Sequence, residues 1–200
     1  MKSIQKNVFL TSCITLCMLI FAACEKAPEQ PKPPTYLRLD VKKSEYIRFE
    51  NKDLPFVFEY PKDCRVERLE SKNKNTYWFN LNVEKYNFEI NVSYFNLTSK
   101  SDLKDAVNDC FTFINRHEKL SAGILQQDYK NQERRVFGTA FELKGRDVVS
   151  PYQFYLTDST RHFIRFALNN KIAPNNDSVS SVVKRLKEDM QHIINTFEWK

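Results

Sequence analysis

Three residues near the C-terminus have the types that a hydrolytic site would need. Asp158, Ser159 and His162 lie within the run YLTDSTRHFIRFAL, residues 155–168. A serine nucleophile needs a base within hydrogen-bond reach and donors that stabilise an oxyanion. No Gly-x-Ser-x-Gly pattern surrounds Ser159, and Asp and Ser favour turns because their side chains bond to the nearby backbone. We therefore expect a β-hairpin that bends at 158–160, and a hydrolase is the least favoured alternative.

Other kinds of chemistry have little support in the sequence. The three histidines, His117, His162 and His192, are not at metal-ligand spacings, and no C-x-x-C pattern occurs. The chain has only three glycines, so neither a P-loop nor a dinucleotide-binding motif can be written. The formal net charge of +6 is spread among acids without a basic block, which argues against nucleic-acid binding. We therefore predict no catalytic residues, no metal site and no cofactor.

The N-terminus has the pattern of an export signal. Lys2 and Lys6 precede an uncharged, largely apolar stretch at 8–23, which is short for a membrane span. The stretch ends in FAAC, which resembles the lipobox of bacterial lipoproteins. We therefore predict a signal peptide at 1–23 and lipidation of Cys24. The alternative is an ordinary cleaved signal that happens to precede a cysteine.

A proline-rich segment follows the predicted lipidation site. Four of the ten residues at 25–34 are proline, which favours an extended tether of up to ~30 Å. We predict that 24–34 forms the lipidated cysteine and tether, and that 35–200 forms a single globular domain. No acidic run follows Cys24, which favours an anchor that faces the periplasm. The choice between inner and outer membrane stays open.

Two cysteines remain in the predicted domain, Cys64 and Cys110. The periplasm permits disulfides, and a bridge between these two would contribute roughly 3–4 kcal/mol by closing a long loop. The alternative is two buried thiols that act as small apolar side chains. The sequence leaves both possibilities open.

The hydrophobic pattern predicts an α+β fold, in which an antiparallel sheet of about five to seven strands carries two main helices. In the run 161–168, the alternation puts His162, Ile164, Phe166 and Leu168 on one face and Phe163 and Arg165 on the other. Which face is buried stays open. The expected strands are 36–40, 46–50, 55–61, 77–83, 88–97, 134–144, 151–158 and 161–168.

The two expected helices span 101–120 and 177–197. Apolar residues recur in both at spacings of three and four, which is typical of a helix that covers a sheet. Asp177 is the expected N-cap of the second helix. The polar side of this helix is expected to consist of Lys184, Arg185, Lys187, Glu188 and Asp189.

Four blocks of the sequence resemble the gliding motility lipoprotein GldD family. They are PKPPTYLRLD, PFVFEYP, QFYLTDSTRHFIRFAL and the C-terminal PNNDSV…LKEDMQHIINTFEWK, and they run from about residue 31 to 200. The element at 56–61 is also similar to the opening strand of PsbP/Mog1-like domains. The family resemblance implies an envelope lipoprotein needed for gliding motility and linked to type IX secretion. It implies no enzymatic activity, cofactor or catalytic residue.

Together these features predict a lipid-anchored, non-enzymatic component of the gliding or secretion apparatus. Its partners would be envelope proteins of that machinery, with the membrane reached through the lipid on Cys24. An exposed aromatic side chain on one of the Phe- and Tyr-rich strands is the expected docking feature. The alternative is a periplasmic lipoprotein that binds a small ligand or glycan in a cleft of the sheet. A deep pocket lined by aromatic and convergent polar groups would favour this alternative.

Overall fold

A computed structural model describes residues 41–71, 73–172, 175 and 177–200, which all belong to one compact unit, Leu37–Lys200. The predicted signal peptide, Cys24, the tether and the expected strand at 36–40 lie outside the described residues. Within the described part, no helix has both the length and the apolar character needed to cross a bilayer.

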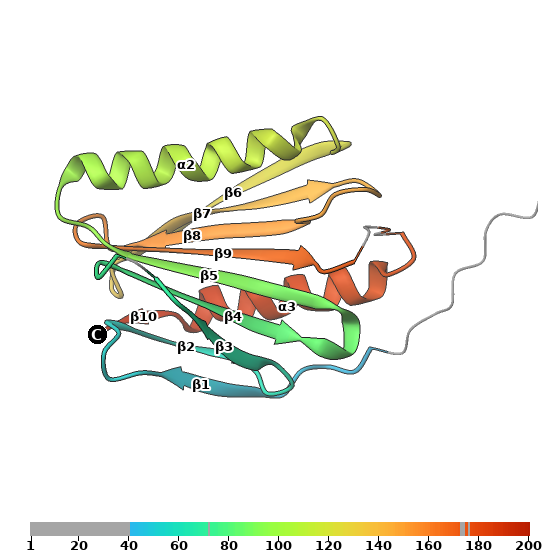
Figure 1. Ribbon diagram of the computed structural model, residues 1–200, viewed down its shortest axis with the longest axis horizontal. Coiled ribbons are helices and arrows are strands. Elements are labelled where there is room, and N and C mark those ends of the chain that lie inside the picture. The colour runs from blue at the N-terminus through green and yellow to red at the C-terminus, as the bar shows by residue number, and fades with distance from the viewer. Residues whose placement is uncertain (1–40, 72, 173–174, 176) are drawn as a thin grey trace, which may run out of the picture. The chain divides into compact units, whose positions relative to one another are not determined.

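The described part of the chain forms two sheets and two main helices (Figure 1). The strands are β1 (Tyr46–Glu50), β2 (Phe56–Pro61), β3 (Arg65–Leu69), β4 (Thr76–Val83), β5 (Phe88–Asn96), β6 (Gly123–Asn131), β7 (Val136–Lys144), β8 (Tyr152–Thr157), β9 (His162–Asn170) and β10 (Glu198–Trp199). The helices are α2 (Lys100–Glu118) and α3 (Ser180–Thr196), with a short 3₁₀ turn, η1 (Glu84–Tyr86).

Seven strands form the large sheet, in the order β3-β4-β5-β9-β8-β7-β6, and every described pairing in it is antiparallel. This confirms the predicted α+β class, with two helices packed on an antiparallel sheet. The first two strands do not join this sheet. Instead β2 pairs with β1 on one side and with β10 on the other, in a separate sheet of order β1-β2-β10.

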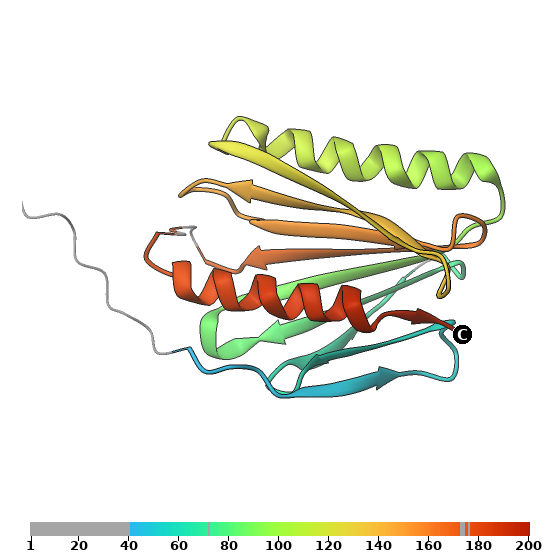
Figure 2. The ribbon, with the colours of Figure 1, turned by 180° about the vertical axis from the view of Figure 1, so that it is seen from behind.

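The main core lies between α3 and one face of the large sheet (Figure 2). The apolar stripe of α3 packs there with the alternate apolar residues of β4, β5, β8 and β9, as the period-two pattern predicts. Phe56, Phe58 and Tyr60 of β2 complete the same cluster. In β9 the core face is therefore that of Ile164 and Phe166.

The other face of the large sheet is covered only in part, by α2. This helix begins with a capping box: the Ser99 hydroxyl accepts from the backbone N–H of Asp102, whose carboxylate accepts from the N–H of Ser99. Its buried residues, Cys110 and Ile114, pack in two small clusters with residues of β7 and β9. Most of this face on β4 and β5 lies beyond these clusters.

Three details of the sequence prediction were wrong. Helix α3 begins at Ser180 with Val179 as N-cap, so Asp177 lies in the preceding turn and caps nothing. Arg185 and Asp189 do not face solvent: they are 8% and 1% exposed, because the segment around β1 covers this side of the helix. There, Arg185 lies within 2.9 Å of Asp63 and 3.3 Å of Asp189.

The structure places the two candidate disulfide partners in different parts of the core. Cys64 and Cys110 are buried free thiols in separate clusters on the two sides of the large sheet. Burial raises the pKa of each thiol to about 12. In this structure both act as small apolar side chains rather than as partners in a bridge.

Candidate functional site

The Asp-Ser-His cluster forms the bend of a hairpin, as predicted. Strands β8 and β9 pair from Thr157↔Phe163 onward, and the bend lies between them. The carboxylate of Asp158 accepts hydrogen bonds of 2.8–2.9 Å from the backbone N–H groups of Thr160, Arg161 and His162. Partial burial acts to raise the pKa of Asp158, but these bonds and one from the Thr160 hydroxyl lower it to about 2.

Ser159 and His162 make their contacts with other residues. Ser159 has a left-handed φ of 66°, and its backbone N–H donates to the Thr157 hydroxyl. The Nδ1 atom of His162 lies 2.8 Å from the Tyr94 hydroxyl, and its ring stacks on Trp199 at 5.3 Å. The three residues therefore build a turn, and this geometry supports no serine nucleophile.

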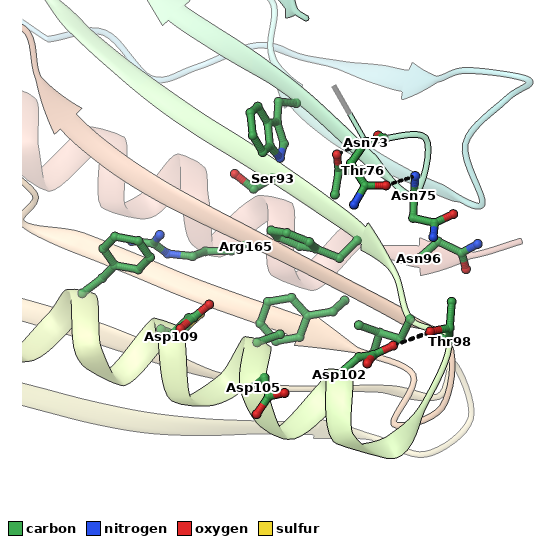
Figure 3. A pocket seen from close by; sticks show the side chains of 17 residues that line it. Asn73, Asn75, Thr76, Ser93, Asn96, Thr98, Asp102, Asp105, Asp109 and Arg165 are labelled. Atoms are coloured by element: carbon green, nitrogen blue, oxygen red, sulfur yellow. Dashed lines mark hydrogen bonds between the residues drawn. The ribbon is translucent and has the colours of Figure 1, made fainter. Parts of the chain in front are cut away.

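The strongest candidate for a binding site is a cleft between α2 and the partly covered face of the large sheet (Figure 3). We call it the α2 cleft. Its volume of about 560 Å³ is within the usual range for ligand pockets. Two rows of cross-strand neighbours on β4, β5 and β9 line its floor. They are Trp78–Ser93–Arg165 and Thr76–Phe95–Phe163.

One stripe of α2 forms the opposite wall. Its residues recur at helical spacing, which brings them to one side of the helix. They are Asp102, Asp105, Ala106, Asp109, Cys110 and Phe113. Figure 3 shows the three aspartates along this side of α2, with Ser93 and Arg165 on the strands opposite. The end of the cleft is closed by the turn at 73–75 and the loop at 96–98.

Two large aromatic side chains in the cleft remain open to solvent. Trp78, on β4, is 38% exposed, and Phe113, on α2, is 39% exposed. Open aromatic side chains in a concave site are typical of surfaces that bind a partner or ligand. The α2 cleft thus has the aromatic feature that the sequence led us to expect on a strand.

Arg165 is the basic group of the cleft floor. Its guanidinium carbon lies 4.3 Å from the centroid of the Phe113 ring, and Nη2 donates to Oε1 of Gln153. Burial lowers the pKa of this guanidinium. No carboxylate among the described residues lies within 4.0 Å of it. Arg165 therefore holds α2 to the sheet mainly by its contact with an aromatic ring.

Beyond the cleft, the same face carries a group of amide side chains that satisfy one another. The Nδ2 atom of Asn91 donates 2.8 Å to Oδ1 of Asn80, and Asn169 donates to Asn91. Asn82 donates 2.7 Å to Glu67 on the edge strand β3. Because these amides already have partners, the α2 cleft offers the more available groups on this face.

The sequence as a whole matches one known family. Residues 26–199 match the profile of the gliding motility lipoprotein GldD family. The chain belongs to this family. Membership makes it a lipid-anchored envelope protein with a role in gliding motility, and it confirms the resemblance found in the sequence blocks. GldD proteins are described by motility and lipidation, and the family description names no enzyme activity.

Among solved structures, a cyanobacterial PsbP structure is similar to this GldD family member. The solution structure of cyanobacterial PsbP (CyanoP) from Synechocystis sp. PCC 6803 has a TM-score of 0.49 and 12% sequence identity. The similarity covers 82% of this chain and 98% of that one. No curated protein sequence matches the chain.

Sequence reasoning named Cys110 and Arg165 for other reasons, and it did not single out Trp78, Asp105 or Asp109. Trp78 fell within an expected strand, and Asp105 and Asp109 fell within an expected helix. The period of two along a strand could have placed Trp78 on the face opposite Phe79, and the helical period could have placed the aspartates on one stripe. Each signal concerns one wall of the cleft, and neither indicates that the walls meet.

Proposed function

We propose that this chain is a non-enzymatic component of the gliding and type IX secretion apparatus that docks an envelope protein in the α2 cleft. In this proposal a lipid on Cys24 anchors the chain, and the tether at 24–34 holds the domain at 35–200 away from the bilayer on the periplasmic side. The open aromatic floor and wall of the cleft, Trp78 and Phe113, carry the docking part of the proposal. Binding is favoured when a partner covers such side chains, because their apolar surface is then removed from water.

Site-specific cross-linking in cells tests the docking surface. A photoreactive amino acid at Ser93, in the cleft floor, is expected to form an adduct with an envelope protein of the motility or secretion machinery. The matched control carries the same amino acid at Lys184, on the exposed side of α3. Adducts that form equally at both positions, or at neither, would contradict docking in the cleft.

Deletion of the gene tests the wider role. A strain without the protein should lose colony spreading and should secrete less of the cargo of the type IX system. The Cys24→Ser variant, which lacks the proposed lipidation site, should restore neither trait. A deletion strain that spreads and secretes normally would show that the proposed role in the apparatus is wrong.

A second candidate function is the binding of a small ligand or glycan. The observation that favours it is the α2 cleft itself, which combines an open indole with amide and carboxylate groups nearby. Titration calorimetry with N-acetylglucosamine oligomers tests this alternative directly. Saturable binding that Trp78→Ala abolishes would favour it over protein docking.

A further inference from the structure

The length of the α2 cleft suits an extended chain better than a compact ligand. Its helical wall runs from Asp102 to Phe113. Eleven steps along the helix at a rise of 1.5 Å give a wall of about 16 Å. An extended peptide advances ~3.3 Å per residue, so the wall is as long as about five residues of such a chain.

The charges of the cleft indicate which charge a bound peptide should carry. Three carboxylates and one guanidinium line it. Asp102 is occupied at the start of α2, where its carboxylate accepts four hydrogen bonds from Thr98 and Ser99. Asp105 and Asp109 have no ion pair within 4.0 Å among the described residues. The cleft therefore presents two carboxylates without a close ion pair, of which Asp109 interacts with the Arg165 guanidinium only at longer range.

The basic and aromatic groups of the cleft also favour a positively charged guest. Arg165 is already engaged by Phe113 and Gln153, so it offers little to an acidic guest. Trp78 is open, and no cation of the described residues lies over its ring. Indole is the side chain on which a lysine or arginine cation binds best.

We propose that the α2 cleft binds an extended basic segment of its envelope partner. A lysine or arginine of that segment lies on the indole of Trp78, and Asp105 and Asp109 supply the complementary charge. This inference rests on the proposed docking function and adds the chemistry of the partner. A neutral glycan brings no charge to balance the two aspartates, and an acidic segment is repelled by them.

Binding of short capped peptides to the processed, detergent-solubilised protein tests the inference. The first probe is a pentapeptide with two lysines around a central phenylalanine, and the second has glutamates in place of the lysines. We expect calorimetry to show affinity for the lysine peptide at least about tenfold above that for the glutamate peptide, since hydrogen bonds to charged groups are strong. The difference should shrink as salt is added.

Variants of the cleft residues test which side chains cause the preference for the lysine peptide. Asp105→Asn combined with Asp109→Asn should remove the preference for lysine, and Trp78→Phe should weaken binding of the lysine peptide roughly threefold. The matched control combines Glu118→Gln, on the same helix, with Asp147→Asn, since both carboxylates are exposed and outside the cleft lining. This control should bind like the unchanged protein. Circular dichroism and thermal unfolding show whether each variant is folded.

Several results would overturn the inference. They are equal affinity for the two peptides, a lysine preference that survives Asp105→Asn with Asp109→Asn, and tighter binding of N-acetylglucosamine oligomers. A cross-linked partner at Ser93 without affinity for the lysine peptide would leave the docking function standing and refute this inference alone. Lysine-peptide binding without any cross-linked partner would support the chemistry of the cleft and contradict the docking function.

Discussion

The phenol hydroxyl of Tyr46 donates a 2.9 Å hydrogen bond to Oδ1 of Asp189. This bond joins β1, at the start of the described chain, to the middle of α3. Arg185 lies one helical turn before Asp189, and its guanidinium also binds Ser44 and Asp63. These polar contacts link the segment around β1 to the side of α3 that carries Arg185 and Asp189.

Arg185→Met should destabilise the domain by about 3–5 kcal/mol, because it leaves the buried Asp189 without its cation. Lys184→Met, at the exposed neighbouring position, should change the free energy of unfolding by less than about 0.5 kcal/mol. Urea unfolding of both variants measures the difference. Similar values for the two would mean that the buried pair contributes nothing beyond a surface charge.

The stability of the Arg185→Met variant should depend on pH in an unusual way. Burial raises the pKa of Asp189, and the loss of Arg185 should raise it further. The folded state would then bind more protons than the unfolded state, so Arg185→Met should regain stability as the pH falls from about 7 to about 5. A variant that only loses stability over this range would contradict this account of Asp189.

The ionised carboxylate of Asp158 should stabilise the hairpin, and this stabilisation should be lost in acid. Its pKa falls from 3.8 to about 2 on folding, so its contribution is complete above pH 3.8 and is lost as the pH falls toward about 2. Asp158→Ala should cost about 2 kcal/mol near neutral pH. The difference in the free energy of unfolding between this variant and the unchanged protein should narrow at about pH 2.5. The control Asp147→Ala should show no such difference at either pH. A gap that is independent of pH would exclude the ionised carboxylate as its source.

The two thiols should be protected until the protein unfolds. Burial and raised pKa values both slow the reaction of Cys64 and Cys110 with a thiol reagent. We expect the processed protein to show two reactive thiols in denaturant without reductant, and almost none when folded. Thiols that appear only after reduction would instead establish the bridge between Cys64 and Cys110.

Gly138 should tolerate no side chain. A Cβ atom there would lie 1.9 Å from the backbone oxygen of Tyr155 on the neighbouring strand. Gly138→Ala should therefore force β7 and β8 apart and destabilise the domain by about 3 kcal/mol. Thermal unfolding measures this cost, and a variant as stable as the unchanged protein would mean that the strands can separate freely here.

Much of the fold followed from local patterns in the sequence. The alternation in 55–61 and the proline at its end predicted β2, and the three-and-four spacing predicted α3. These patterns report the burial of one face, which each element needs wherever it packs. Strands β3 and β6 were missed because they lie at the two edges of the large sheet. All five residues of β3 are exposed, so its sequence carries no apolar alternation.

Local patterns also failed where an element is covered on two sides. Helix α3 has one apolar stripe, and the sequence therefore placed Arg185 and Asp189 in solvent. They are buried because the segment around β1 covers this side of the helix, where Arg185 pairs with Asp189 and Asp189 accepts a hydrogen bond from Tyr46. Charged residues that pair on burial have the same local signature as charged residues on a surface.

The sequence by itself determined the family, the hairpin at Asp158 and which residues share each face of a strand or helix. Only the tertiary structure decided that Trp78, Asp105 and Arg165 line one cleft, because they come from three segments far apart in the chain. The reason is that α2 packs on β7 and β9 and leaves β4 and β5 partly uncovered. Local periodicity sets which side of an element is apolar, whereas the extent of its coverage depends on packing between elements.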